Sequence, residues 1–390
     1  MQVTLLDALV GTYRADRPTL VSARGCTVTT DEGRELLDFV AGIGVNALGY
    51  AHPVVDNAVQ AGLATGLLHA SNLYRNLPAQ KLANLLTELS FADKVFFSNS
   101  GGEANEAAFK FARRYAREVA NGDKHEIVAL KGSFHGRLFG TLAATDRPSF
   151  RAPFEPLMPG VRFIVPGDFD GATSTISRER TAAIIVEPVQ GEGGIRPLDA
   201  RYVQHLRELA DANDAVLIFD EIQCGLGRTG ALFAYEHFGV APDILTLAKP
   251  LAGGLPMGAV LVTEKVAAPI KPGDHATTFG GGALVSTVAH AVVEHIAAPE
   301  FLAEVKAKGE LLTTLLNELT LSPKVNEVRG IGMMWGIELN ETAMPYVTRA
   351  FDAGLLVTTA GENVIRLLPP LVVSEQQIQH AVRVLAQVLQ

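Results

Sequence analysis

Short runs of apolar residues, several of them rich in valine and isoleucine, recur through the middle of this chain. They lack the strict apolar–polar alternation of a strand with one wet face, which predicts strands buried on both faces, as in a parallel sheet. Helical stretches at residues 103–120 and 201–212 separate several of these runs, and this alternation is typical of α/β folds. The predicted strands are residues 94–97, 126–130, 182–187, 215–220, 243–247 and 258–263.

The two ends of the chain follow a different pattern. Residues 27–39 alternate around an Asp-Glu-Gly turn at residues 31–33, which predicts a β-hairpin. After about residue 280 come two long helical patterns, further strands and a last helix from Ser374, which together predict an α+β arrangement. The predicted division is a small domain formed by residues 1–48 and 280–390, and a large domain formed by residues 49–279.

Composition limits the function classes. Charged residues make up only 19% of the 390 residues, so much of the chain must be buried in a core and an interface. The net charge of −9 offers no electrostatic reason to expect nucleic acid or an anionic membrane as a partner. Two cysteines, Cys26 and Cys224, are too few for a disulfide framework or a cysteine metal site. With no signal-peptide pattern at the start and no membrane-spanning apolar run, we expect a cytoplasmic protein without a metal.

The first candidate site follows the strand at residues 94–97. Here the sequence Ser-Asn-Ser-Gly-Gly-Glu, residues 98–103, leads into a helix. The free N–H groups and dipole of a helix start favour a phosphate, and Gly101 and Gly102 would let its oxygens approach the backbone. An ordinary helix start capped by Ser98 or Ser100 is the alternative reading.

A second candidate is Asp220, which ends the apolar strand at residues 215–220. Such a carboxylate can cap a structure, bind a metal or contact a cofactor. The chain contains no Gly-Lys dipeptide, which excludes a nucleoside-triphosphate loop. Residues 225–230 contain a GxGxxG pattern that leaves an NAD-dependent dehydrogenase as an alternative, although polar residues separate its glycines from the strand.

The third candidate is Lys249, directly after the strand at residues 243–247 and enclosed by apolar neighbours. A lysine there can extend its charged end to solvent, or it can be an amine of lowered pKa that bonds to an aldehyde cofactor. Asp220 and Lys249 end successive strands, and ligands of such sheets bind at these ends. A lysine, a carboxylate for a ring nitrogen and a helix start for a phosphate are the three anchors that pyridoxal 5′-phosphate requires.

Many segments carry a resemblance to a known family. FFSNSGGEANEAAFKFAR, VEPVQGEGG, LIFDEIQCGLGRTG, LAKPLAGGLPMGA and IRLLPPL occur in this order over nearly the whole chain. They resemble the class III, fold-type-I, pyridoxal-phosphate-dependent aminotransferases. The resemblance implies an α/β large domain with a mostly parallel central sheet, a smaller α+β domain and a homodimer with shared active sites.

The resemblance also implies roles for individual residues. Lys249 matches the lysine that bonds to the cofactor and later moves the proton, and Asp220 matches the carboxylate on the ring nitrogen. Thr278 matches a hydroxyl that reaches the phosphate from the partner subunit. The other implied cofactor contacts are Gly101, Gly102, Phe134, which stacks on the ring, Glu221 and Gln223. His135 belongs to no metal-binding pattern, and we expect it behind the residues that contact the cofactor.

For the substrates, Arg137 matches the arginine that holds the carboxylate remote from the reacting amine, and Thr277 a further contact. Arg366 matches the arginine for the α-carboxylate of 2-oxoglutarate or glutamate, and Glu192 the acid that pairs with it in the other half-reaction. Within the family the resemblance points to transfer of the δ-amino group of N2-acetylornithine to 2-oxoglutarate. Ornithine, succinylornithine and 4-aminobutyrate are the alternative amines. Two departures, SGGEA and GGGAL, add glycine and predict looser cofactor loops.

Overall fold

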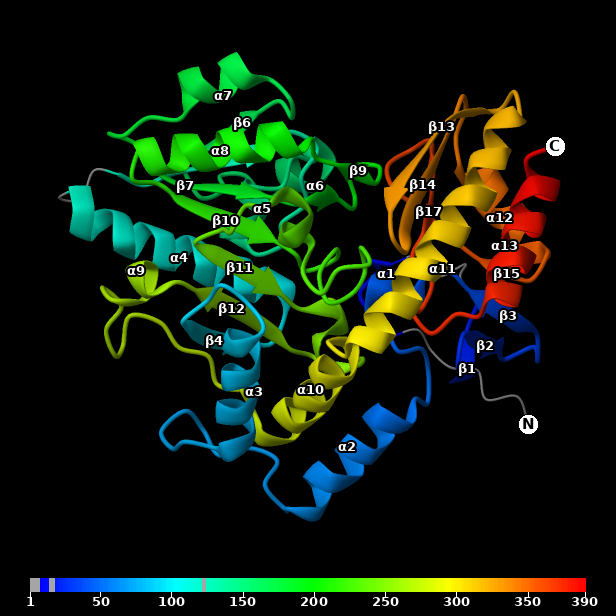
Figure 1. Ribbon diagram of the computed structural model, residues 1–390, viewed down its shortest axis with the longest axis horizontal. Coiled ribbons are helices and arrows are strands. Elements are labelled where there is room, and N and C mark those ends of the chain that lie inside the picture. The colour runs from blue at the N-terminus through cyan, green and yellow to red at the C-terminus, as the bar shows by residue number, and fades with distance from the viewer. Residues whose placement is uncertain (1–7, 14–17, 121–123) are drawn as a thin grey trace.

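Seven strands form one mixed sheet in the larger part of the computed structural model (Figure 1). The structure describes residues 8–13, 18–120 and 124–390. Neighbouring strands run parallel except around β12, so the predicted mostly parallel α/β sheet is confirmed. In spatial order the strands are β4 (Lys94–Ser98), β12 (Gly258–Val262), β11 (Ile244–Leu247), β10 (Val216–Asp220), β7 (Thr181–Val186), β5 (Glu126–Leu130) and β6 (Val161–Ile164). The sequence reading missed β6, a four-residue strand interrupted by an arginine.

Helices cover both faces of this sheet because its strands carry apolar side chains on both. Along β10, Val216 and Ile218 join the apolar cluster that includes α4 (Gly101–Ala120). Leu217 and Phe219 instead join the cluster that includes α8 (Ala200–Ala212). Each buried Val, Leu, Ile or Phe side chain contributes about 1.5–3 kcal/mol, so two-sided packing holds the strand ends, and the side chains that follow them, in place.

The smaller part combines both ends of the chain, with the first strands beside the last helices (Figure 1). The predicted hairpin is confirmed, because β2 and β3 pair antiparallel on either side of the Asp-Glu-Gly turn, and β3 also pairs parallel with β15. Its strands are β1 (Leu20–Arg24), β2 (Thr27–Thr30), β3 (Glu35–Asp38) and β15 (Leu355–Leu356) in one sheet, and β13 (Val325–Ile331), β14 (Met334–Leu339), β17 (Val364–Leu367) and β16 (Thr358–Thr359) in another. Its helices are α11 (Pro299–Asn317), α12 (Met344–Asp352) and α13 (Glu375–Val388).

The division into domains stays a proposal. The pairing of β3 with β15 supports a small domain built from both ends of the chain. Helix α10 (Ala283–Ile296), however, packs against α2 (Pro53–Ala64) and α3 (Leu77–Glu88), which belong to the proposed large domain. We therefore propose to move the last boundary from residue 280 to the junction of α10 and α11. The first residues of the proposed N-terminal segment lie partly outside the described residues.

Shorter elements connect these layers. Within the part of the chain that the structure describes, no helix has the length and apolar character that crossing a membrane requires. The shorter elements are α1 (Ala41–Gly44), α5 (Phe139–Ala143), α6 (Pro148–Arg151), η1 (Ala152–Phe154), α7 (Phe169–Thr175), β8 (Val189–Gln190), β9 (Arg196–Pro197), η2 (Ala234–Phe238), η3 (Lys249–Ala252), α9 (Glu264–Ala267) and η4 (Glu318–Leu321).

Candidate active site

A cavity of about 380 Å³ opens where β4, β7, β10 and β11 reach their carboxyl ends. This is the edge at which sheets of this type bind ligands. Because β10 and β11 are parallel neighbours, the residues that follow them are brought side by side. Seven of the predicted site residues line the cavity: Gly101, Gly102, Phe134, Glu192, Asp220, Gln223 and Lys249.

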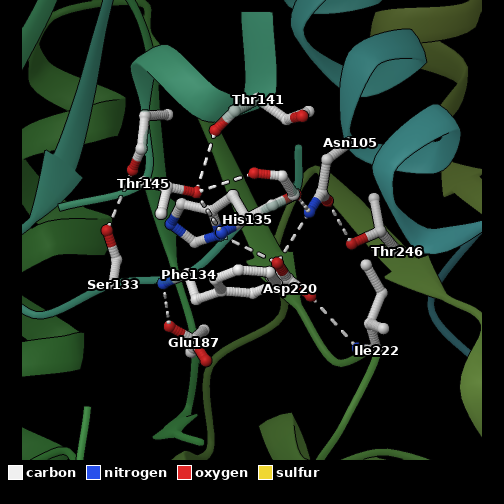
Figure 2. Close-up of polar contacts among 12 residues, drawn as sticks. Asn105, Ser133, Phe134, His135, Thr141, Thr145, Glu187, Asp220, Ile222 and Thr246 are labelled. Carbon is white, nitrogen blue, oxygen red and sulfur yellow. Dashed lines mark hydrogen bonds and ion pairs between the residues drawn. The ribbon is translucent and has the colours of Figure 1, made fainter. Parts of the chain in front are cut away.

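Asp220 is a buried carboxylate that lines the cavity. Its side chain is 4% exposed, and its Oδ2 accepts hydrogen bonds from Asn105 Nδ2 at 2.7 Å and His135 Nδ1 at 2.8 Å. Because a carboxylate only accepts, the Nδ1 of His135 carries the proton. Asn105 is held in turn by the Thr246 hydroxyl, which donates to its Oδ1 at 2.7 Å. Figure 2 shows Asn105 and His135 converging on Asp220, with the Phe134 ring beside it.

Lys249 begins η3 immediately after β11 and is half-buried at the cavity wall. Burial lowers the pKa of its amine, and the nearby Arg366 guanidinium lowers it further, against the opposing effect of Glu192 and Asp220. A lowered pKa increases the fraction of neutral amine, which is the form that attacks an aldehyde. Lys249 lines the cavity, and its role as the reactive amine stays a prediction.

The start of α4 forms another wall of the cavity through Asn99, Ser100, Gly101 and Gly102. The Glu103 carboxylate turns back to accept from the Asn99 backbone N–H at 2.6 Å, which closes the helix start. A side chain at Gly101 would place its Cβ 2.8 Å from the Ile222 side chain, which would have to shift to make room. At Gly102 an added Cβ would meet only ordinary contacts, the nearest at 3.7 Å.

Glu192 and Arg366 form an ion pair at the cavity, so the predicted pairing is present while the roles of both residues stay a prediction. Arg366 lies on β17 and is 2% exposed, and its Nη1 also approaches Gln223 Oε1 at 3.5 Å. Burial raises the pKa of Glu192, but the positive charges of Arg366, Lys249 and Arg147 outweigh this and hold the pKa below its ordinary value. Glu192 therefore carries a negative charge that neutralises Arg366.

Besides Arg366, four predicted residues lie outside the cavity lining. Glu221 points elsewhere: its carboxylate accepts from the backbone N–H groups of Ala234 at 2.6 Å and Tyr235 at 2.7 Å, and burial raises its pKa to about 8. Arg137 is exposed and stacks on the Phe150 ring at 3.6 Å. Thr277 accepts from Asn99 Nδ2 at 2.9 Å, which ties its loop to the start of α4, and Thr278 is exposed.

The sequence reading missed Glu187 and Asn105. Glu187 follows β7 and lines the cavity, and it accepts the backbone N–H groups of Phe134 at 2.9 Å and Gly191 at 3.0 Å. Burial raises the pKa of Glu187 to about 7. Its position directly after an apolar strand is the same signal that marked Asp220, whereas nothing in the sequence marks Asn105, one turn into α4.

Comparison with known proteins identifies the family of this chain. A family model described as "Aminotransferase class-III" matches residues 13–389. The chain belongs to the class III aminotransferases. The acetylornithine aminotransferase of Alnus glutinosa, named as mitochondrial, is 50% identical over 98% of this chain and 85% of its own length.

Solved class III aminotransferases have the same fold. The N-acetylornithine aminotransferase of Stenotrophomonas maltophilia is 33% identical, with a TM-score of 0.83 over 96% of this chain and 95% of its own. The ornithine aminotransferase of Toxoplasma gondii is 28% identical, with a TM-score of 0.93 over 98% and 92%, and its active site is described as partly occupied by pyridoxal phosphate. The fold is therefore that of the fold-type-I enzymes, and the dehydrogenase alternative drawn from residues 225–230 is wrong.

The cofactor of class III aminotransferases is pyridoxal 5′-phosphate, and the residues of this cavity fit it. The cavity wall combines a buried carboxylate, an aromatic ring, an amine of lowered pKa and a helix start where a Cβ at Gly101 would intrude. The carboxylate suits the ring nitrogen, the aromatic ring suits the ring face, the amine suits the aldehyde, and the helix start suits the phosphate. Among the described residues, no group of three or more His, Cys, Asp or Glu side chains could hold a metal.

Proposed function

We propose that this class III aminotransferase transfers the δ-amino group of N2-acetylornithine to 2-oxoglutarate. The products are N-acetylglutamate 5-semialdehyde and glutamate, in a step of arginine biosynthesis. The observation that carries the proposal is the Glu192–Arg366 ion pair beside Lys249, because it lets one cavity accept both an amine and a dicarboxylate. The names of the relatives support the choice of amine.

Within this proposal the chain's own residues divide the chemistry. When bound, pyridoxal phosphate supplies an aldehyde for the amino group and a ring that accepts the electrons released when a substrate C–H bond breaks. The Lys249 amine anchors the cofactor and then moves the proton taken from that carbon. Asp220 keeps the ring nitrogen protonated, and Phe134 and Gln223 orient the ring. The α4 start, with Gly101 and Gly102, holds the phosphate.

Substrate recognition follows from charge. Arg366 would meet the α-carboxylate of glutamate or 2-oxoglutarate with two parallel hydrogen bonds. The δ-amine end of the acylated substrate has no carboxylate beside its reacting carbon, so Glu192 would then remain paired with Arg366. Arg137 is proposed to hold the remote carboxylate and Thr277 to contact the acylated substrate. Arg137 lies over the ring of Phe134, which lines the cavity, and Thr277 is bonded to Asn99, which also lines it.

The substrate proposal is tested by the wild-type enzyme alone. Initial rates with 2-oxoglutarate are measured for N2-acetylornithine, succinylornithine, ornithine and 4-aminobutyrate. We expect the highest kcat/KM with N2-acetylornithine. A higher value with ornithine would contradict the proposal and favour the second candidate function, which the Toxoplasma gondii neighbour represents.

Replacing Glu192 with alanine should change which substrate the enzyme prefers. Arg366 would lose its carboxylate partner. The α-carboxylate of glutamate could then pair with the free guanidinium, whereas the acylated amine has no carboxylate at that position and would leave Arg366 unpaired. We expect the ratio of kcat/KM for glutamate to that for the acylated amine to rise about 10- to 100-fold, the worth of one charge-assisted hydrogen bond. The exposed Glu264→Gln serves as a control. An unchanged ratio in Glu192→Ala would refute the role of the pair.

We also propose that the enzyme is a homodimer. A patch of exposed apolar side chains lies on the segment from α2 to α3 and on the loop of Thr277 and Thr278. The rings of Phe279 and His69 lie tilted to each other with centroids 5.3 Å apart, and Asn72 donates to the Thr277 carbonyl, so the two segments form one surface. A patch of this kind is typical of an interface. Its apolar members are Leu63, Leu67, Leu68, Leu73, Tyr74, Leu77 and Phe279. Thr278 would then reach the partner's phosphate site.

Charge placed in this patch should weaken the dimer. Leu73 is 85% exposed, and Leu321, far along the chain on η4, is 87% exposed, so the two leucines form a matched pair. We expect Leu73→Asp to raise the dissociation constant at least tenfold, since a buried unpaired charge is costly, and to lower specific activity as dimers separate. Leu321→Asp should leave both unchanged. Sedimentation velocity over a concentration series gives the comparison, and equal behaviour of the two variants would contradict the proposed interface.

We further propose that the enzyme is cytoplasmic. Cys26 and Cys224 are both buried and unpaired, which suits a reducing compartment. The Alnus glutinosa relative is named as mitochondrial, so the alternative compartment is an organelle. Cell fractionation with an antibody against the native enzyme separates the two.

A further inference from the structure

The loop that carries Glu192 contains two residues in a left-handed backbone conformation. It connects β8 to β9, and within it Gly194 has φ 102° and Ile195 has φ 53°. A β-branched residue such as isoleucine rarely adopts this left-handed conformation and does so only where its surroundings enforce it. The position of the Glu192 carboxylate therefore depends on contacts from outside the loop.

Those contacts come from both parts of the molecule. On one side, Arg147 donates to the Glu192 carbonyl. On the other, Arg329 of β13 donates from Nε to the Gly194 carbonyl at 2.8 Å. Figure 1 shows β9, at the end of this loop, facing β13 and β14, and β13 contacts β9.

Two carboxylates fix the orientation of the Arg329 side chain. It is 9% exposed, and its Nη1 donates to Glu327 at 2.5 Å and also to Glu338 of β14. Glu338 also accepts from Arg196 of β9 at 3.1 Å, which fixes the far end of the loop. Because both acids hold the guanidinium in one orientation, its Nε is directed at Gly194.

Arg366, the ion-pair partner of Glu192, lies in register with Arg329 in the same sheet. Arg329 lies opposite Gly336, and Gly336 lies opposite Arg366, so the two arginines share one face of the sheet, on the strands either side of β14. Gly336 between them leaves room for the loop, because a Cβ there would come within 3.0 Å of Ile195. One arginine thus binds the loop backbone at Gly194, and the other binds the Glu192 carboxylate.

We propose that Arg329 is a positioning residue that sets the strength of the Glu192–Arg366 pair and thereby the balance between the two substrates. The proposal rests on the proposed function of that pair. When Arg329 holds Gly194, Glu192 covers Arg366 and the acylated amine is accepted. When the contact is lost, Glu192 pairs less often and Arg366 is free for an α-carboxylate.

The test compares Arg329→Gln with Glu192→Ala in the glutamate half-reaction and in the half-reaction of the amine that the wild type prefers. We expect Arg329→Gln to raise the kcat/KM ratio for glutamate over the amine by about three- to tenfold, within the range of coupling in one ion-pair network. The KM for glutamate should fall while its kcat stays nearly constant. In the Glu192→Ala background, Arg329→Gln should change the ratio no further.

Two further variants test the same proposal if Arg329→Gln folds poorly. Arg329→Lys retains the charge with fewer donors and should give an intermediate ratio, and Gly336→Ala displaces Ile195 without touching a charge and should shift the ratio in the same direction. Glu264→Gln is the control, because Glu264 pairs with Lys94, is 63% exposed and has no contact to the loop or to Arg329 among the described residues. Its ratio should match the wild type.

Two results would overturn the proposal. One is an equal loss of kcat/KM for both substrates in Arg329→Gln, as a purely structural role would give. The other is an undiminished effect of Arg329→Gln in the absence of Glu192. Failure of the proposed function is seen separately, in the wild-type rates and in Glu192→Ala alone.

Discussion

Lys249→Ala should lower kcat at least ~10⁴-fold, the upper end of what a positioned acid–base group contributes. The variant loses both the amine that anchors the cofactor and the group that moves the proton. The lowered pKa of Lys249, caused first by burial, makes its neutral form available for both tasks. The kcat is measured with N2-acetylornithine and 2-oxoglutarate at saturating pyridoxal phosphate.

A second measurement locates the attachment. After borohydride treatment, mass spectrometry of the wild type should find the cofactor mass on the peptide that contains Lys249, and the alanine variant should lack it. Lys131 is the matched control, because it also follows a strand of the same sheet directly but is exposed. Lys131→Ala should keep kcat within about twofold, as surface substitutions usually do. Retained activity in Lys249→Ala would remove this residue from the chemistry.

Asp220→Asn should lower kcat by about 10³-fold, within the range of a lost proton-holding group. A neutral amide cannot keep the ring nitrogen protonated. Its NH₂ group would also have to avoid Asn105 Nδ2 and His135 Nδ1, both of which donate to the carboxylate. Asp220→Glu keeps the charge and should retain more activity than the asparagine variant. Steady-state kcat and the visible absorption of the bound cofactor are the readouts.

Asp243 provides the control for this prediction. It is also buried, but at the start of β11, where it accepts from the Leu217 backbone N–H at 2.8 Å and pairs with Arg207 at 2.9 Å. Asp243→Asn should therefore lower the free energy of unfolding while kcat changes little. If Asp220→Asn, like Asp243→Asn, lowered the free energy of unfolding and left kcat nearly unchanged, Asp220 would have a structural role only.

The sequence predicted most of the fold because the information is local. Runs such as 126–130 and 215–220 are apolar on both faces, and only burial between two helix layers satisfies such a strand. The hairpin and the last helix carry their own turn and capping signals, including Ser374, whose hydroxyl accepts from Gln377 N–H. The packing of α10 on α2 and α3 has no such local signal.

The site shows the same limit at the level of side chains. Adjacent residues can turn in opposite directions, so Asp220 faces the cavity while Glu221 accepts two backbone N–H groups behind it. Resemblance to a family assigned both of them to the cofactor. Glu187 ends a neighbouring strand as Asp220 does, yet only the structure shows that it is buried beside Phe134 and Gly191.

By itself the sequence determined the α/β class, the strand ends that carry Lys249 and Asp220, and the helix start with Gly101 and Gly102. Each of these depends on residues a few positions apart in the chain. Family resemblance implied that Glu192 pairs with Arg366, but only the tertiary structure showed that pair in place and Arg329 holding the Glu192 loop. These contacts join residues more than a hundred positions apart, and their geometry depends on how the two parts of the molecule pack, which no local pattern encodes.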